Sequence, residues 1–413
     1  MTDIEDHLES LRESGLYRKL RAISGPQGPR VLLDGKPVLL LCSNNYLGLA
    51  DHPRVREAAA EGAMRWGVGA GASRLVSGGM TVHRRLEEQL AAFKGSDACV
   101  LFGSGYLANT GIVSALAREG EVVFSDALNH ASIVDGCRLA KAETFVYRHS
   151  DMDHLEWGLQ EANGRGSLIV TDGVFSMDGD IAPLAKIVEL ARRYDARVMV
   201  DDAHGLGALG PGGRGSVAAA GLEDEVDIVV GTLGKSLGSY GAYACMSRTM
   251  SKYLINTART LIFSTALSPP AVAAAGAALE LLIEDPRRVD RLQRNAKIMR
   301  EALAGHGLAT GDSTTQVLPL VVGAADDAVR VCERALEKGI FAQAIRPPTV
   351  AEGSSRLRLA VMASHTRTEL QEAAGVLAKA MRAIVGDQPR PVPVEAMREP
   401  DRKRIFDGLA EAA

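Results

Sequence analysis

Lys235 has the surroundings that most favour a reactive role. It lies in GTLGKSLG (231–238), directly after an apolar run of strand length. A lysine among glycines and small residues can be desolvated, which lowers the pKa of its amine and makes it a nucleophile. A solvated loop lysine is the alternative, which the apolar neighbours disfavour. The Walker A loop is excluded, because its first glycine would fall at Val229.

A second motif, VDDAHG (200–205), places two acids and a histidine at the end of another apolar run. A carboxylate at this point, such as Asp201, can keep the ring nitrogen of a heteroaromatic cofactor protonated, and His204 follows three residues later. A helix cap with a surface pair of acids is the plainer interpretation. Metal binding is a further alternative, but the remaining histidines lack the spacing to complete a metal site.

The other two motifs are FGSGYLAN (102–109) and SDALNHAS (125–132). In the first, glycines between a strand and a helix let the backbone approach a phosphate, and the helix N-terminus favours an anion. The same motif matches the dinucleotide-binding fingerprint, with Asp126 at the spacing of a ribose-binding acid. His130 of the second motif could stack on a flat cofactor or shuttle a proton, with a core or capping histidine as the alternative.

Together the four motifs describe one site for pyridoxal phosphate (PLP). PLP chemistry needs a phosphate cradle, an acid at the ring nitrogen, a group on the ring face and a lysine that forms a Schiff base. Gly105, His130, Asp201 and Lys235 follow one another along the chain, each at the end of a different expected strand. A Rossmann dinucleotide-binding protein would account for the first motif and leave Lys235 and Asp201 without a role.

The elements that must position these motifs are alternating strands and helices between residues 38 and 246. Amphipathic stretches at 82–93, 108–116 and 184–194 predict helices between apolar runs. Because the runs are apolar nearly throughout, they predict strands buried on both faces of a largely parallel sheet, with ligands beyond the carboxyl ends. The seven predicted strands are 38–42, 99–102, 122–124, 168–171, 198–201, 228–231 and 242–246.

The pattern changes after Pro269 and Pro270. Further elements there predict a smaller α+β domain, with helices at 271–283, 287–306, 328–338 and 368–384 and strands at 317–322, 340–345 and 356–361. We therefore expect an α/β protein with four parts. These are an N-terminal segment (1–50), a large domain that binds PLP (51–275), a small C-terminal domain (276–385) and a flexible, Pro-rich, charged tail (386–413).

The composition excludes several kinds of partner. The chain has 413 residues and a net charge of −4, so nothing favours nucleic acid or an anionic membrane surface. No apolar run approaches the roughly 18 residues that a membrane span needs. The five cysteines are scattered without a CxxC pair, as expected of reduced thiols. These features predict a soluble, cytoplasmic protein.

Further motifs extend these four along most of the chain, from about residue 11 to 380. They are SNNYLGL (43–49), GAGASRLVSGG (69–79), HRRLEEQLA (83–91), DGVFSMDGDIAPL (172–184), FSTALSPP (263–270) and IRPPTV (345–350). With them, the sequence resembles the α-oxoamine synthase family of fold-type I PLP-dependent transferases.

The resemblance implies a role for each residue around the cofactor ring. Lys235 would form the Schiff base and remove the Cα proton of the amino acid. Asp201 would pair with the pyridinium nitrogen, and His204 with Ser176 would contact the phenolic oxygen. His130 would stack on the ring and act as an acid near the acyl carbonyl.

The resemblance also implies how the phosphate is held. Backbone N–H groups of Gly105 and Tyr106, together with Thr232, would bind it. Ser264 and Thr265 would be donated by the neighbouring subunit. The expected assembly is therefore a homodimer with its active site at the subunit interface.

For the substrates, the resemblance implies that Arg358 binds the amino-acid carboxylate, with Asn44 or Asn45 nearby. Arg18 and the IRPPTV segment, including Thr349, favour a donor with a distal carboxylate. The expected reaction joins L-alanine to a pimeloyl thioester of CoA or acyl carrier protein, with loss of CO₂, in biotin biosynthesis. A sibling enzyme that uses glycine or serine is the alternative, and a PLP aminotransferase a more distant one.

Overall fold

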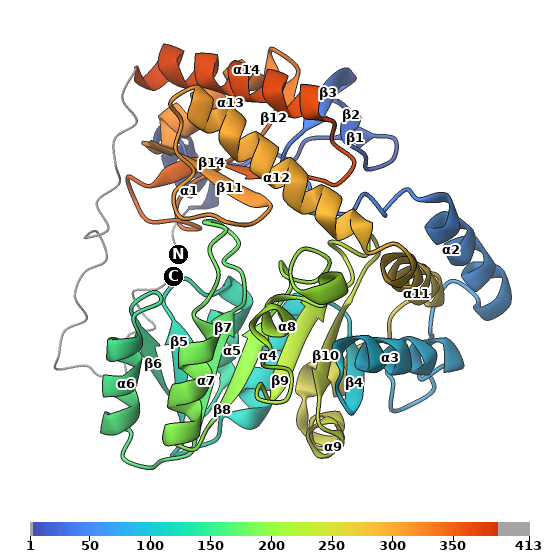
Figure 1. Cartoon of the computed structure of the whole chain (residues 1–413). Coiled ribbons are helices and arrows are strands. Elements are labelled where there is room, and N and C mark those ends of the chain that lie inside the picture. Colours follow the sequence, from blue (N-terminus) through green and yellow to red (C-terminus); the bar gives the residue numbers. More distant parts are fainter. Residues whose placement is uncertain (1–2, 387–413) are drawn as a thin grey trace. The chain divides into compact units, whose positions relative to one another are not determined.

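The computed structural model describes residues 3–386, which form two compact units (Figure 1). The larger unit comprises residues 49–176 and 180–289. The smaller unit comprises residues 3–48, 177–179 and 290–386. Apart from Gly386, the tail predicted at 386–413 lies outside the described residues.

A seven-stranded sheet forms the centre of the larger unit, in the order β4-β10-β9-β8-β7-β5-β6. β10 is antiparallel to both of its neighbours, and the other strands run parallel. The strands are β4 (Ala98–Phe102), β5 (Val122–Asp126), β6 (Glu143–Tyr147), β7 (Ser167–Asp172), β8 (Ala196–Asp201), β9 (Ile228–Thr232) and β10 (Ala242–Met246). The predicted α/β class with a largely parallel sheet is therefore confirmed.

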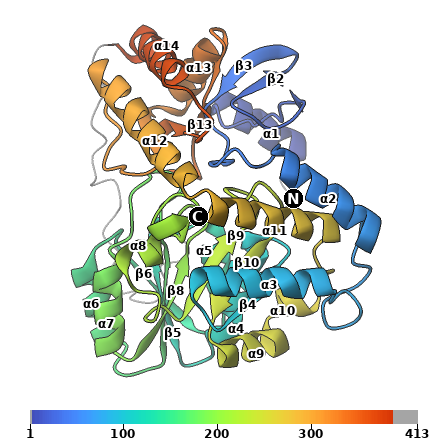
Figure 2. The same ribbon diagram turned by 45° about the vertical axis from the view of Figure 1, so that its right-hand side comes forward.

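Helices cover both faces of this sheet, because alternate residues of each strand point to opposite sides (Figures 1 and 2). In β7, for example, Leu168 and Val170 belong to one core and Ile169 to the other. One face packs against α4 (Gly105–Leu116), α5 (Ala131–Leu139), α9 (Arg248–Thr257) and α10 (Arg259–Ile262). The other packs against α6 (Met152–Glu161), α7 (Leu184–Arg193) and α8 (Ser216–Ala220).

Three further helices complete the larger unit: α2 (Pro53–Trp66), α3 (Thr81–Lys94) and α11 (Pro269–Glu284). α11 packs on α2 and α3, and α3 in turn packs on β4 and β10, as Figure 2 shows. A side chain at Gly62 of α2 would collide with Ala273 of α11, so the close approach of these two helices requires a glycine.

The smaller unit contains two sheets. One has the order β1-β2-β3-β12 and the other the order β11-β14-β13. The strands are β1 (Ile23–Ser24), β2 (Arg30–Leu33), β3 (Lys36–Leu40), β11 (Val317–Gly323), β12 (Ile340–Phe341), β13 (Gln343–Ile345) and β14 (Ser355–Ala360). Its helices are α1 (Ile4–Glu13), most of α12 (Arg287–Gly305), α13 (Ala325–Leu336) and α14 (Arg367–Val385).

The observed units differ from the predicted domains at two boundaries. The apolar run 38–42 is not a strand of the large sheet: β3 pairs with β2 and β12, so the N-terminal segment belongs to the smaller unit. The predicted boundary at residue 275 would cut α11, which lies wholly in the larger unit because it packs on α2 and α3.

Two details of secondary structure also differ from the prediction. The predicted strand 340–345 is two short strands, β12 and β13, in different sheets. The edge strand β6 was not predicted, because its sequence ETFVY contains Glu143 and Thr144 and so lacks a continuous apolar run. In both cases the strand depends on a pairing partner distant in sequence.

Candidate active site

The four motifs meet at one edge of the large sheet. β5, β7, β8 and β9 are adjacent and parallel, so their carboxyl ends lie together. β7 ends at Asp172, β8 at Asp201 and β9 at Thr232. Lys235 follows β9 in a short loop, and His130 follows β5 as the N-cap of α5.

Lys235 and His204 are in direct contact. The Nζ atom of Lys235 lies 2.7 Å from Nε2 of His204, and the lysine is half-buried while the histidine is buried. The loop around the lysine is held by Ser236, whose Oγ donates to the carbonyl oxygen of Leu206 at 2.6 Å. Two residues that the sequence predicted for one site thus form a pair.

Asp201 is buried and accepts hydrogen bonds from two sides. Nδ2 of Asn109 donates to its Oδ2 at 2.6 Å, and the backbone N–H of Ala203 donates to its Oδ1 at 2.9 Å. Both oxygens of the carboxylate are thus held by donors, which fixes its orientation. The sequence analysis missed Asn109 as a partner; the signal that could have revealed it is an amide among the mostly apolar residues of helix α4, where a buried polar group needs a hydrogen-bond partner.

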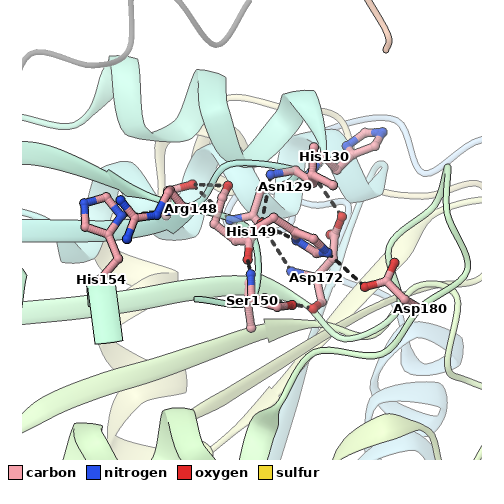
Figure 3. A network of polar contacts seen from close by, with 12 residues as sticks. Asn129, His130, Arg148, His149, Ser150, His154, Asp172 and Asp180 are labelled. Carbon is pink, nitrogen blue, oxygen red and sulfur yellow. Dashed lines mark hydrogen bonds and ion pairs between the residues drawn. The ribbon is translucent and has the colours of Figure 1, made fainter. Parts of the chain in front are cut away.

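The imidazole of His130 is oriented by its neighbours. Its Nδ1 lies 2.7 Å from the Oγ of Ser132, and its backbone N–H donates to Asp172 at 3.1 Å (Figure 3). Burial lowers the pKa of His130, the carboxylate of Asp201 partly offsets this, and the charge of Lys235 lowers the pKa further. Three predicted site residues therefore act on one another electrostatically.

Asp172 is a second buried acid at this edge, and the sequence analysis did not single it out. Burial is the main cause that raises its pKa well above the ordinary value, and Asp201 adds to the rise. Lys235 and the N–H of His130 act in the opposite direction. Its place at the end of a continuously apolar strand, as for Asp201, is the signal that could have revealed it.

The predicted phosphate cradle is open at the start of α4. Ser104 caps the helix by accepting a hydrogen bond from the N–H of Leu107 at 3.2 Å. A Cβ atom at Gly105 would meet nothing within 4 Å, which leaves space against the backbone. Tyr106 is exposed, and its hydroxyl hydrogen-bonds Asp135. Thr232 holds its own loop, donating to the carbonyl oxygen of Gly241 at 3.1 Å.

The remaining predicted cofactor residues also lie in the larger unit. Ser176 is half-buried in the segment after β7. Ser264 is half-buried and Thr265 exposed, between α10 and α11, and Thr265 forms an isolated antiparallel bridge with Ser73. An open glycine cradle, a carboxylate held by donors and a half-buried lysine at one sheet edge fit PLP.

The predicted substrate residues lie in the smaller unit, and two of them, Arg358 and Asn44, form a group with Tyr46. Arg358 of β14 is buried, and its guanidinium donates to Oδ1 of Asn44 at 3.1 Å and to the hydroxyl of Tyr46 at 3.3 Å. Asn45 is buried and points elsewhere, since its Nδ2 donates to the carbonyl oxygen of Gln27 at 3.1 Å.

Arg18 lies at the IRPPTV segment. Its Nη2 donates to the carbonyl oxygen of Pro347 at 3.1 Å. Both Arg18 and Thr349 are exposed, and the N–H of Thr349 donates to the carbonyl oxygen of Arg346 at 3.1 Å. Two segments more than 320 positions apart are therefore neighbours.

Asp126, the acid that a dinucleotide site would require, has a different function in this structure. It is buried and accepts from Nδ1 of His149 at 2.9 Å and from the N–H groups of Leu128 and Ser150 at 2.8 and 2.9 Å. With its oxygens occupied in this way, Asp126 is a structural anchor. The Rossmann alternative thereby loses its ribose-binding acid.

The surface pair of acids and the metal site, both alternatives for the VDDAHG motif, do not fit the structure of residues 3–386. Asp202 is not part of a surface pair of acids, since it is fully buried and accepts a hydrogen bond from Lys94 at 2.8 Å. Among residues 3–386 no group of three or more His, Cys, Asp or Glu side chains is arranged to hold a metal ion. None of the helices in that range is long and apolar enough to cross a membrane.

Comparison with known proteins identifies the class. The model of the aminotransferase class I and II family matches residues 36–377, and this chain belongs to that family. The resemblance found in the sequence and the fold-type I architecture are both confirmed.

Relatives of known name point to a particular enzyme within this family. The 8-amino-7-oxononanoate synthase of Citrifermentans bemidjiense is 56% identical, over 91% of this chain and 97% of that one. The enzyme of the same name from Geobacter sulfurreducens is 53% identical over the same shares.

Solved structures agree with this placement. Serine palmitoyltransferase from S. paucimobilis, solved with a bound PLP–myriocin aldimine, has a TM-score of 0.88 at 32% identity, covering 93% of this chain and 98% of that one. The 8-amino-7-oxononanoate synthase of Francisella tularensis has a TM-score of 0.73 at 27% identity, covering 84% and 98%.

Proposed function

We propose that this chain condenses L-alanine with a pimeloyl thioester, giving 8-amino-7-oxononanoate, CO₂ and the free thiol in biotin biosynthesis. The observation that carries the proposal is the 56% identity to an 8-amino-7-oxononanoate synthase over 97% of that enzyme. The cofactor is PLP, which supplies an electron sink for the negative charge that develops on the Cα atom of alanine.

Lys235 holds the cofactor and then serves as the base that takes the Cα proton. A general base must reach the proton that it removes, and its pKa must suit the working pH. The contact of Lys235 with His204, at 2.7 Å, supports this role because it orients the amine.

Asp201 accepts the hydrogen bond of the protonated ring nitrogen. Its two donors, Asn109 and the N–H of Ala203, fix its orientation. His204 and Ser176 contact the phenolic oxygen of the ring. Backbone N–H groups of Gly105 and Tyr106, with Thr232, bind the phosphate. The open space at Gly105 supports this assignment.

Arg358 binds the carboxylate of alanine through its fork of N–H donors. Its hydrogen bonds to Asn44 and Tyr46 hold the guanidinium in one orientation and support this role. At the other end of the product, Arg18 and Thr349 bind the distal carboxylate of the pimeloyl chain. The contact of Arg18 with Pro347 supports that pairing.

The working form is a homodimer in the cytoplasm, in which Ser264 and Thr265 of one subunit contact the phosphate of the other. Burial of exposed apolar side chains of the larger unit against a partner would remove their surface from water and so favour association. Met64 is 89% exposed, Val76 79% and Phe263 71%.

A panel of substrates tests the reaction. We expect release of free thiol, and a product of the mass of 8-amino-7-oxononanoate, with L-alanine and pimeloyl-CoA or pimeloyl-carrier protein. Glycine with acetyl-CoA and serine with palmitoyl-CoA are the competing pairs. Preferred turnover of the serine pair would contradict the proposal.

A serine-specific sibling is the second candidate, because the TM-score to serine palmitoyltransferase exceeds that to the Francisella tularensis enzyme. An aminotransferase would form keto acid from alanine without consuming any thioester, so measuring pyruvate in the same panel separates that activity from both condensations.

A further inference from the structure

A chain of hydrogen bonds links Asp201 to His130 through two fully buried side chains, Asn109 and Ser132. Nδ2 of Asn109 lies 2.6 Å from Oδ2 of Asp201 and 2.8 Å from Oγ of Ser132. The same Oγ lies 2.7 Å from Nδ1 of His130. The donor and the acceptor in each of these hydrogen bonds determine which ring nitrogen of His130 carries a proton.

The carboxylate of Asp201 sets the orientation of the amide of Asn109. An ionised carboxylate only accepts hydrogen bonds, so the atom that faces it at 2.6 Å must be the NH₂ group. In the opposite orientation two oxygens would repel each other in a buried place. The second N–H of this NH₂ group then points to Ser132, and the hydroxyl oxygen accepts it.

The backbone of Ser132 decides which atom donates between its hydroxyl and His130. The N–H of Ser132, which can only donate, lies 3.3 Å from Nδ1 of the imidazole, so Nδ1 is an acceptor. The hydroxyl of Ser132, whose oxygen accepts from Asn109, therefore uses its own proton to donate to the same Nδ1 at 2.7 Å. Both donors require an unprotonated Nδ1.

We infer that Ser132 and Asn109 are positioning residues that hold His130 as the neutral imidazole with its proton on Nε2. Among residues 3–386 no group hydrogen-bonds this Nε2, so its N–H is available to a ligand. An imidazolium would need a proton on Nδ1, where two donors already point.

The charges around His130 are compatible with the neutral form. Burial is the largest effect and lowers the pKa of His130, the charge of Lys235 lowers it further, and the carboxylate of Asp201 only partly offsets them. Asp172 also faces the residue through the backbone N–H, and its own pKa is raised well above the ordinary value.

The consequence for the reaction rests on the proposed function. His130 would act on the oxygen of the acyl carbonyl as a neutral hydrogen-bond donor through Nε2–H, and not as an imidazolium acid. A donor that is already in place stabilises developing negative charge without reorganisation. This refines the role of acid that the sequence analysis assigned to His130.

NMR of the full-length protein labelled with ¹⁵N-histidine tests the inference directly. Two-bond ¹H–¹⁵N correlations distinguish the two neutral tautomers from the imidazolium. The chain has nine histidines, and a His130→Gln variant assigns the signal in question. We expect the Nε2–H tautomer at neutral pH, with and without PLP. A proton on Nδ1, in either the neutral or the charged form, would overturn the inference.

A Ser132→Ala variant tests the positioning role. It removes a donor that favours the neutral ring, so the pKa of His130 should rise and the single tautomer should be lost. The rate kcat/KM should fall about tenfold, the effect of one ordinary hydrogen bond. Ser114→Ala is the matched control, since Oγ of Ser114 donates to the carbonyl oxygen of Thr110 within α4.

An unchanged titration of His130 in the Ser132→Ala variant would contradict the positioning role. Measuring the tautomer of His130 in the unmodified protein requires neither a variant nor a substrate. A failure of the substrate panel with the expected tautomer would therefore refute the proposed function alone, and the reverse result would refute this inference alone.

Discussion

The amine of Lys235 and the imidazole of His204 touch at 2.7 Å, beside a carboxylate, Asp201, that two donors hold in place. The contact of Lys235 with His204 joins residues 31 positions apart, and the bond of Asn109 to Asp201 joins residues 92 positions apart. At this scale the candidate site consists of a few polar groups, each oriented by a neighbouring polar group.

Lys235→Ala should abolish turnover. The loss of proton transfer alone costs roughly 10²- to 10⁴-fold in rate, and the loss of the covalent attachment adds to it. The visible absorbance of the purified enzyme should disappear as well. Lys186→Ala is a matched control, because Lys186 is an exposed lysine paired with Glu189 on α7. Turnover that survives in Lys235→Ala would refute the assignment.

Arg358→Lys should weaken the use of alanine without the same effect on the thioester. The lysine keeps the charge but loses the fork that contacts Asn44 and Tyr46. A charged hydrogen bond contributes about 1.5–3 kcal/mol, so kcat/KM for alanine should fall roughly 10- to 100-fold. Steady-state kinetics with each substrate varied in turn measures this. An equal loss for both substrates would argue against a carboxylate site at Arg358.

At the scale of elements, buried ionic groups fasten the loops that follow the strands. His149 bridges Asp126 at 2.9 Å and Asp180 at 3.0 Å, which joins the end of β5 to the segment after β7 (Figure 3). Lys94 at the end of α3 donates to Asp202 at 2.8 Å, just beyond β8. Neither bridge touches the proposed substrates, so both predictions concern stability.

The His149 bridge should make stability depend on pH. Although burial opposes it, the two carboxylates raise the pKa of His149 to about 10, against about 6.5 in an unfolded chain. The folded state thus holds the extra proton, and the stabilisation is complete below pH 6.5 and lost as the pH rises toward 10.

Thermal unfolding across that range measures the effect. In the unmodified protein Tm should fall more steeply with rising pH than in His149→Gln, and the two curves should converge near the upper end. Parallel curves over the whole range would contradict an imidazolium at this position.

Lys94→Met should destabilise the larger unit by about 3–5 kcal/mol, because it leaves the buried charge of Asp202 without its cation. Both side chains of the pair are at most 4% exposed. Unfolding by urea, followed by circular dichroism, measures the loss. Lys94→Met combined with Asp202→Asn should recover part of it, since the uncompensated charge is then gone. A double variant no more stable than Lys94→Met would contradict this explanation.

At the scale of the whole molecule, a homodimer with shared active sites would allow two impaired variants to complement each other, which is impossible in a monomer. Lys235→Ala and the double variant Ser264→Ala with Thr265→Ala should each be impaired alone. If the serine and threonine reach the partner's phosphate, a mixed dimer of the two variants contains one complete site.

Mixing the two variants, with refolding to exchange subunits, should therefore restore activity and high-affinity binding of PLP. Without any shared site, each subunit of the mixed dimer would carry one defect and nothing would recover. Refolding each variant alone is the control.

The sequence by itself determined the class of protein, and it predicted the cofactor residues that the structure brings to one edge of the large sheet. Apolar runs that end in Asp201 or precede Lys235 identify buried strands, and local chemistry at their ends needs no knowledge of distant contacts. It did not reveal Asn109, Ser132 or Asp172 as partners, the pairing of β3 with β12, or the anchoring of Asp126 by His149.

These features depend on residues that are distant in the sequence, and a hydrogen bond or a strand pair exists only once folding has brought both partners together. The orientation of the His130 proton is the clearest case. A histidine in a polar motif leaves its tautomer open, and only the positions of Ser132 and Asn109 relative to Asp201 decide it.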